Sequence, residues 1–150
     1  MHSVDLSSLD LMDVVSEVEP DRQLRVAFPH HSAVGSASIA TVYFELEPGG
    51  RLGLHTDSAE ELLLILEGDA EATIGDEQAR AGAGTVLTVP AMEPHDVWNV
   101  GPGTLRVLGF FSASTVVATF AEPLAPGGAQ LFVIGAPMPL AVPLEEPVPA

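Results

Sequence analysis

Proline and glycine interrupt this chain so often that long helices are not expected. Its 150 residues include 13 prolines and 14 glycines, and both residue types weaken a helix interior. The stretches between them are short, often alternate in polarity and carry β-branched residues, which is typical of strands. Such stretches occupy residues 23–28, 37–47, 51–55, 61–67, 70–74, 78–81, 85–89, 95–100, 105–111 and 115–120. The sequence therefore predicts an all-β fold, either an antiparallel sandwich or a small barrel.

The two ends of the chain depart from this pattern. Residues 6–18 have a partly helical spacing of apolar side chains, so we expect a short helix or an irregular arm there. From Gly135 onward the sequence is rich in proline, which predicts an extended tail and excludes a central strand. The expected organisation is an N-terminal arm and first strand (1–36), a β-barrel (37–120) and a C-terminal extension (121–150) with its proline-rich tail from about residue 135.

The charge of the chain excludes several kinds of partner. Five arginines and no lysine stand against 21 acidic residues, giving a formal net charge of −16. Such a surface repels phosphate backbones and anionic lipids, so neither nucleic acid nor a membrane is an expected partner. The chain has no cysteine, and it shows neither a signal peptide nor an apolar stretch that could span a membrane. A cytoplasmic protein is therefore expected.

The predicted strand at residues 61–67 has two apolar faces. Side chains alternate along a strand, so Leu63 and Ile65 share the face of Glu61, while Leu62, Leu64 and Leu66 point the other way. A strand with one face in water does not normally carry three leucines outward. We expect a second subunit or the N-terminal arm to cover these leucines, and a homodimer is the favoured assembly.

Two histidines stand among carboxylates in a pattern that suggests a metal site. His55 and Asp57 are two apart, so on a strand they point the same way, and Glu61 begins the next predicted strand. His95 follows a stiff turn, Pro90–Pro94, and can reach the same place from a later strand. Imidazole and carboxylate groups that converge in this way bind divalent transition metals.

These residues carry a resemblance to the cupin family. The first cupin motif is Gly, five residues, His-x-His, three residues, Glu, six residues, Gly, and it is matched by Gly49, His55, Asp57, Glu61 and Gly68. The second motif is Gly, five residues, Pro-x-Gly, two residues, His, three residues, Asn, and it is matched by Gly84, Pro90, Met92, His95 and Asn99. Asp57 stands where the motif has a second histidine, and Met92 stands where it has a glycine. The 15 residues between the motifs resemble the short spacing of microbial cupins.

The resemblance implies a double-stranded β-helix, that is, a small jelly-roll barrel. It also implies a metal held at His55, Asp57, Glu61 and His95, with Fe(II), Mn(II) and Zn(II) all open. Asp57 is either a ligand or a nearby group, and in the second case it is a candidate acid or base. Two histidines and one carboxylate would then remain, as in non-haem iron oxygenases. An empty barrel with hydrogen-bonded interior histidines is the alternative to a metal site.

The family's pocket lies inside the barrel, so a small organic substrate is expected there. Candidate lining residues are Tyr43, Leu63, Met92, Val97 and Phe110. The resemblance implies a metal-dependent enzyme of dioxygenase or isomerase type. The alternative is a non-catalytic cupin that senses or stores a small molecule, with or without metal.

Overall fold

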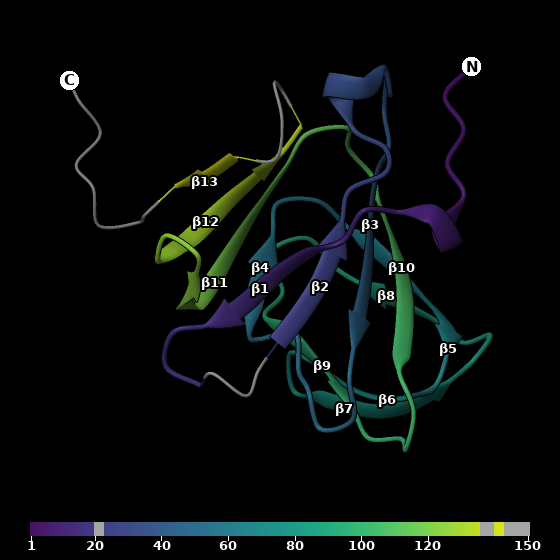
Figure 1. Ribbon diagram of the computed structural model, residues 1–150, viewed down its shortest axis with the longest axis vertical. Coiled ribbons are helices and arrows are strands. Elements are labelled where there is room, and N and C mark those ends of the chain that lie inside the picture. Colours follow the sequence, from purple (N-terminus) through teal and green to yellow (C-terminus); the bar gives the residue numbers. More distant parts are fainter. Residues whose placement is uncertain (20–22, 136–139, 143–150) are drawn as a thin grey trace.

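The computed structural model describes residues 1–19, 23–135 and 140–142 (Figure 1). Strands dominate it, and the only helical elements among these residues are two short 3₁₀ turns, η1 (Leu6–Ser8) and η2 (Ser32–Val34). The strands are β1 (Met12–Ser16), β2 (Gln23–Ala27), β3 (Ala40–Leu46), β4 (His55–Asp57), β5 (Glu61–Glu67), β6 (Asp69–Ile74), β7 (Glu77–Gly82), β8 (Val86–Val89), β9 (His95–Asn99), β10 (Leu105–Phe111), β11 (Val116–Ala125), β12 (Ala129–Ile134) and β13 (Leu140–Val142). The all-β prediction is confirmed.

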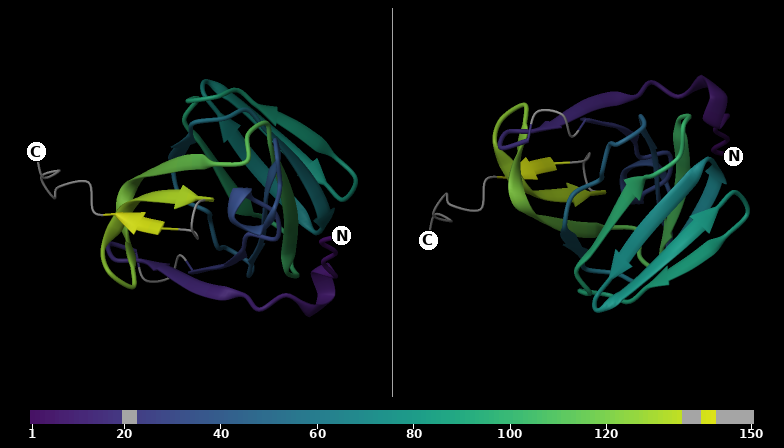
Figure 2. Two further views of the ribbon diagram at one scale, coloured as in Figure 1. Left: turned by 90° about the horizontal axis from the view of Figure 1, so that it is seen from above. Right: turned by 90° about the horizontal axis from the view of Figure 1, so that it is seen from below.

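All strand pairs in the described residues are antiparallel, and they form one curled sheet (Figure 2). The strand order is β7-β6-β9-β4-β11-β1-β2-β3-β10-β5-β8, with β12 and β13 continuing from β11. Gly75 and Asp76 form the two-residue turn between β6 and β7, in which Ile74 faces Glu77. Such a turn is favoured because glycine accepts the positive φ that a tight hairpin requires.

The N-terminal segment differs from the predicted helix or irregular arm. Only three of its residues are helical, in η1, and residues 12–16 form strand β1. This strand lies between β11 and β2, with Val15 facing Ala125 on one side and Gln23 on the other. The spacing of apolar side chains in residues 6–18 did not reveal this strand. Only Val14 and Ser16 are buried in it, and the apolar Met12 is exposed, so apolar and polar residues do not alternate as they do in a regular strand.

The C-terminal part adds two strands that the sequence analysis did not predict. β12 pairs with β11, and β13 pairs with β12 at the edge of the sheet, where proline-rich sequence is tolerated. The remainder of the predicted proline-rich tail, at 136–139 and 143–150, lies outside the described residues. β2 pairs with β3 and β1 with β11, so hydrogen bonds run across both of the expected boundaries near residues 36 and 120.

The inside of the curled sheet holds the main hydrophobic core. Leu63 and Ile65 of β5 are each 1% exposed, and burying each such side chain contributes roughly 1.5–3 kcal/mol. The outward leucines of the same strand behave differently, since Leu62 is 42% exposed and Leu64 and Leu66 are partly buried. Among the described residues, no helix is long and apolar enough to cross a membrane.

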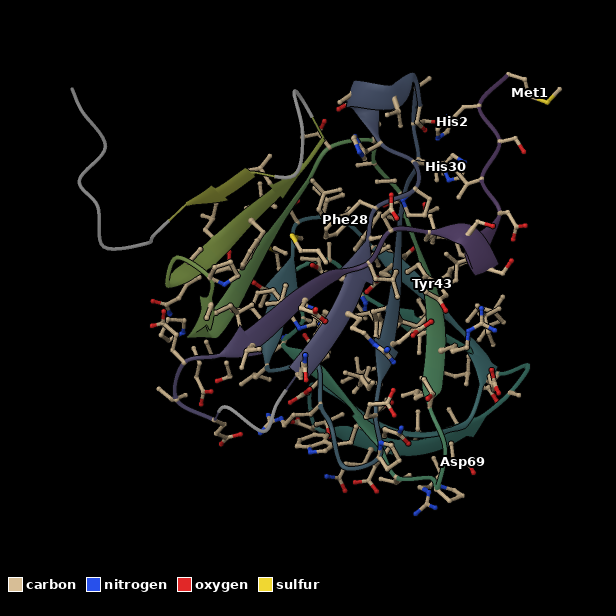
Figure 3. The ribbon with its side chains drawn as sticks, in the orientation of Figure 1. Met1, His2, Phe28, His30, Tyr43 and Asp69 are labelled. Atoms are coloured by element: carbon tan, nitrogen blue, oxygen red, sulfur yellow. The ribbon has the colours of Figure 1, made fainter. Side chains whose placement is uncertain are left out.

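The N-terminal arm covers part of this outer face. Val4 and Leu6 line a shallow hollow together with Leu108 and Phe110 of β10. The arm is held at its start by His2, whose Nε2 lies 2.8 Å from the backbone oxygen of Pro29 and whose ring meets that of His30 edge to face. Both histidines are labelled in Figure 3. The arm therefore covers part of the outer face of β10, while Leu62 of the neighbouring strand β5 stays exposed in the single chain.

Candidate metal centre

Strand β4 positions one histidine between two ring partners. It lies between β9 and β11, with His55 directly opposite His95 on one side and Phe120 on the other. The two imidazole centroids are 4.0 Å apart, and the His55 ring stacks on that of Phe120 at 4.6 Å and 13°. Both histidines are buried: His55 is 6% exposed and His95 is 1% exposed. This pairing fixes both imidazoles on the inner side of the sheet.

The hydrogen bonds of the two histidines determine which nitrogen is free. His55 Nδ1 lies 2.7 Å from the backbone oxygen of Gly53, and His95 Nδ1 lies 2.9 Å from that of Glu93. A carbonyl oxygen only accepts, so each Nδ1 carries the hydrogen and donates it. In the neutral imidazole each Nε2 then has a bare lone pair, which is how metal-ligating histidines are held in proteins.

Two carboxylates face these nitrogens. Asp57 Oδ2 lies 3.5 Å from His55 Nε2 and 3.1 Å from His95 Nε2, and Glu61 Oε1 lies 3.5 Å from His95 Nε2. Asp57 and Glu61 are each 3% exposed. Asp57 Oδ2 and His95 Nε2 are buried without a well-formed hydrogen bond to any described residue. Lone pairs gathered in this way repel one another unless a cation lies between them. The donor atoms of His55, Asp57 and His95 all lie within 4.8 Å of one another and could hold a metal ion.

Without a metal, protons would have to supply this positive charge. Burial lowers the pKa of His95, but the neighbouring carboxylates of Asp57 and Glu61 outweigh burial and raise it to about 10. Burial raises the pKa of Asp57, but the two histidines outweigh it and lower that pKa to about 2. For Glu61, burial is the largest influence and the pKa is raised. The site therefore favours a positive charge between its carboxylates, which a proton on His95 supplies when no metal is bound.

A buried carboxylate that is not one of the four candidate ligands, Asp96, holds the backbone just before β4 in place. Asp96 is 1% exposed, and its Oδ1 accepts hydrogen bonds from the backbone N–H groups of Gly53 and Val97, both at 2.8 Å. Its Oδ2 accepts from Arg51 Nε at 2.8 Å, and Arg51 also lies over the ring of Trp98. These contacts hold the backbone around Gly53, whose oxygen orients His55. The sequence analysis missed this role because Asp96 alternates with the inward-facing His95 and gives no spacing signal.

Gly109 of β10 makes the space for Glu61. A Cβ at this position would lie 2.3 Å from Glu61 Oε2, whereas real Cβ contacts are essentially never shorter than 3.0 Å. The carboxylate of Glu61 reaches inward from β5, and it rests on the backbone of the neighbouring strand. Leu108-Gly109-Phe110 gives no turn signal in the sequence, so a glycine inside a strand was the available clue to a close approach.

A cavity of about 190 Å³ opens beside three of the four candidate ligands. His55, Asp57 and Glu61 line it, and the remainder of the described wall is apolar and comes mainly from β1, β2, β3, β11 and β12, with Phe111 of β10 and the loop residues Leu52 and Pro126. Phe28, which follows β2 and is labelled in Figure 3, also lines it.

None of the five predicted pocket residues lines this cavity. Leu63 and Val97 do point inward, but they fill the core. Tyr43 is on the opposite face of β3 from Phe44, and its hydroxyl contacts Arg106 Nε at 2.7 Å. Phe110 is on the outer face beside the N-terminal arm, and Met92 is 60% exposed. Part of the wall comes from β1 and β12, strands that the sequence analysis did not anticipate.

Comparison with protein families and known structures agrees with this architecture. The family model described as "Cupin domain" matches residues 42–111. A search of curated proteins gave no match to this sequence. The cupin domain of Schizosaccharomyces pombe Cnp3 is similar in structure, with a TM-score of 0.61, 20% identity, and coverage of 74% of this chain and 73% of that one.

Oxalate decarboxylase of Bacillus subtilis is also similar. A structure solved at pH 4.6 gives a TM-score of 0.60 and 23% identity, covering 73% of this chain and 29% of that one. A structure described by its Mn(II) centres gives 0.58 and 23%, covering 66% of this chain and 28% of that one. This chain thus spans less than a third of the oxalate decarboxylase chains. The similarity confirms the predicted jelly-roll fold.

Proposed function

Residues 42–111 of this chain form a cupin domain, and from this premise we propose that the protein is a divalent-metal-dependent enzyme acting on a small organic molecule inside the barrel. The observation that carries the proposal is the set of bare donor atoms described above. His55 Nε2, Asp57 Oδ2 and His95 Nε2 converge in a buried place, and backbone carbonyls already hold the opposite nitrogen of each histidine. A divalent cation satisfies all of them at once.

We assign His55, Asp57 and His95 as ligands, with Glu61 as the fourth donor. This set of two imidazoles and two carboxylates suits Fe(II), Mn(II) or Zn(II). The Mn(II) centres named for the oxalate decarboxylase structure support a metal of this class. When bound, the metal would supply Lewis acidity toward a carbonyl or hydroxyl oxygen or, as iron or manganese, a site for dioxygen.

The chain's own residues set the conditions for that chemistry. Apolar side chains such as Val26, Phe44 and Phe132 line the cavity beside the site, so water there finds few hydrogen-bond partners. Glu61 lines the cavity, so its carboxylate is in a position to hold a proton of a bound molecule. Asp57 also lines the cavity. Its carboxylate can hold a proton of the bound molecule in the same way if another donor takes the place of Asp57 at the metal. These features fit the dioxygenase-type and isomerase-type reactions that the family resemblance implies.

The first test is metal content. Protein purified without a histidine tag and analysed for transition metals should contain about one equivalent per chain, as a buried four-donor site implies. His55→Ala should lose most of this metal, and His30→Ala should retain it, because His30 lies in the loop beside His2. Wild-type protein that neither contains nor takes up a transition metal contradicts the proposal.

The second test distinguishes the reaction types. Oxygen uptake by the iron-loaded protein in the presence of small carbonyl and aromatic compounds would identify a dioxygenase. Rearrangement of the same compounds without oxygen, followed by NMR, would identify an isomerase. The wholly apolar lining beyond the ligands favours one second candidate, a binding protein without turnover. Saturable binding with neither reaction would identify that function.

A further inference from the structure

The composition of the cavity wall restricts what the site can bind. Apart from His55, Asp57 and Glu61 at one end, every described residue that lines the cavity is apolar. A polar ligand group placed against this wall would lose its water and find no hydrogen-bond partner among the described residues, which is unfavourable. We therefore expect the part of the ligand that lies against this wall to be apolar, with its polar group at the ligand end.

The charge of the cavity excludes an anionic ligand. None of the four described arginines lines it. Three of them pair elsewhere, Arg25 with Glu45, Arg51 with Asp96 and Arg106 with Glu67, and Arg80 is exposed on β7. Asp57 and Glu61 already match the two charges of a divalent metal. A carboxylate on the ligand would thus remain as an unbalanced negative charge in an apolar cavity, and this is strongly unfavourable.

The size and the wall residues point to one ring. A cavity of about 150 Å³ lined by aliphatic and aromatic side chains binds benzene, and this one measures about 190 Å³. Phe44, Phe120 and Phe132 line it, and aromatic rings pack favourably against such side chains in edge or offset contacts. The volume admits a ring with one short substituent.

We infer that the cavity takes an uncharged compound with one six-membered ring, preferably aromatic, and a single carbonyl or hydroxyl oxygen directed at His55, Asp57 and Glu61. This inference rests on the proposed function for the role of the metal, but the apolar wall carries it independently. It separates this site from one built for a small dianion such as oxalate, which the names of the structural neighbours mention.

The test compares three probes on one metal-loaded sample by calorimetry. Acetophenone is uncharged and has the proposed size, benzoate has the same ring with a negative charge, and oxalate is a dianion. Acetophenone should bind at least tenfold more tightly than benzoate. Oxalate should act only by removing metal, which elemental analysis after dialysis detects.

A pair of variants locates the binding. Ala125 lines the cavity near the end of β11, and Ala121 of the same strand is exposed. Ala125→Phe should weaken acetophenone binding at least tenfold, while Ala121→Phe should leave it within twofold. Metal content and melting temperature, measured for both variants, show that each is folded and loaded.

The outcomes separate the two proposals. Metal binding without acetophenone binding, or benzoate binding as tightly as acetophenone, overturns the inference and leaves the proposed function standing. Acetophenone binding that Ala125→Phe abolishes, in a protein that takes up no metal, supports the inference and overturns the proposed function. Equal binding by Ala125→Phe and Ala121→Phe places the probe outside the cavity and overturns the inference.

Discussion

Replacing Gly109 with alanine tests whether Glu61 contributes to the metal site. The added Cβ would lie 2.3 Å from Glu61 Oε2 and 2.8 Å from Val42 Cγ1. Val42 can respond by a small change of its side chain. The carboxylate must retreat by at least about 0.7 Å to reach the shortest contacts seen in proteins, and by about 1.1 Å to reach ordinary contact at 3.4 Å. Sites of this kind require ligands to be held within about 0.5 Å.

The expected result is weaker metal binding in a folded protein. Loss of support for a ligand typically costs 10–100-fold in metal affinity, which corresponds to about 1.4–2.7 kcal/mol. Competition with a chelator of known affinity measures the change. The melting temperature of the metal-free protein, recorded in parallel, separates this effect from overpacking, which costs about 1–3 kcal/mol of stability.

Two further variants make this experiment decisive. Gly103→Ala introduces the same methyl group where nothing lies within 4 Å, and it should bind metal as the wild type does. Glu61→Asp shortens the side chain, so the double change of Gly109→Ala with Glu61→Asp should lose less affinity than the sum of the two single changes. A folded Gly109→Ala protein with metal affinity within twofold of the wild type would refute the assignment of Glu61 as a ligand.

Three other predictions follow from the site and the outer face. Metal binding at pH 7 should release about one proton, because a pKa of about 10 keeps His95 protonated in the metal-free protein and the metal must displace that proton. The metal affinity should therefore fall on acidification. Calorimetry in buffers of different ionisation heat tests this, and a heat of metal binding that is the same in all buffers would contradict it. Met92→Gly should raise the free energy of unfolding by about 1 kcal/mol, because Met92 has a φ of 64° in the left-handed region; urea unfolding of Met92→Ala, which keeps a Cβ, should show no such gain. Wild-type protein should scatter light as a dimer that buries the outward leucines, and Leu62→Glu should scatter as a monomer, so a monomeric wild type would contradict the homodimer.

The candidate ligands were predictable because strand geometry is regular. Residues two apart point the same way, so His55 and Asp57 necessarily share a face, and the strand that Glu61 begins runs back along the barrel. The same alternation predicted that Leu62, Leu64 and Leu66 of β5 point away from the face of Glu61. These inferences need only the period of a strand and not the pairing of one strand with another.

The cavity was not predictable for the opposite reason. Its wall depends on which strands become neighbours: β1 joins β11 from the other end of the chain, and β12 folds back beside β11 as the next strand. Tyr43 was expected to line the pocket, but the register of β3 directs Val42 and Phe44 inward instead. A shift by one residue exchanges the two faces of a strand, and sequence spacing alone does not fix that choice. The same limit hid Gly109, whose importance depends on the strand beside it.

The position of β1 has a consequence for biosynthesis. β1 is made first, yet its partner residues Leu124 and Ala125 lie more than a hundred positions later in the chain. A ribosome therefore releases the first strand long before the strand that it must join exists, and its other neighbour, β2, offers only a marginal hairpin meanwhile. The barrel wall beside the candidate metal site can close only after residue 125 has emerged. The pairing of β1 with β11 is a long-range contact, which is the slow kind to form, so we expect the wall of the apolar cavity to be completed late in folding.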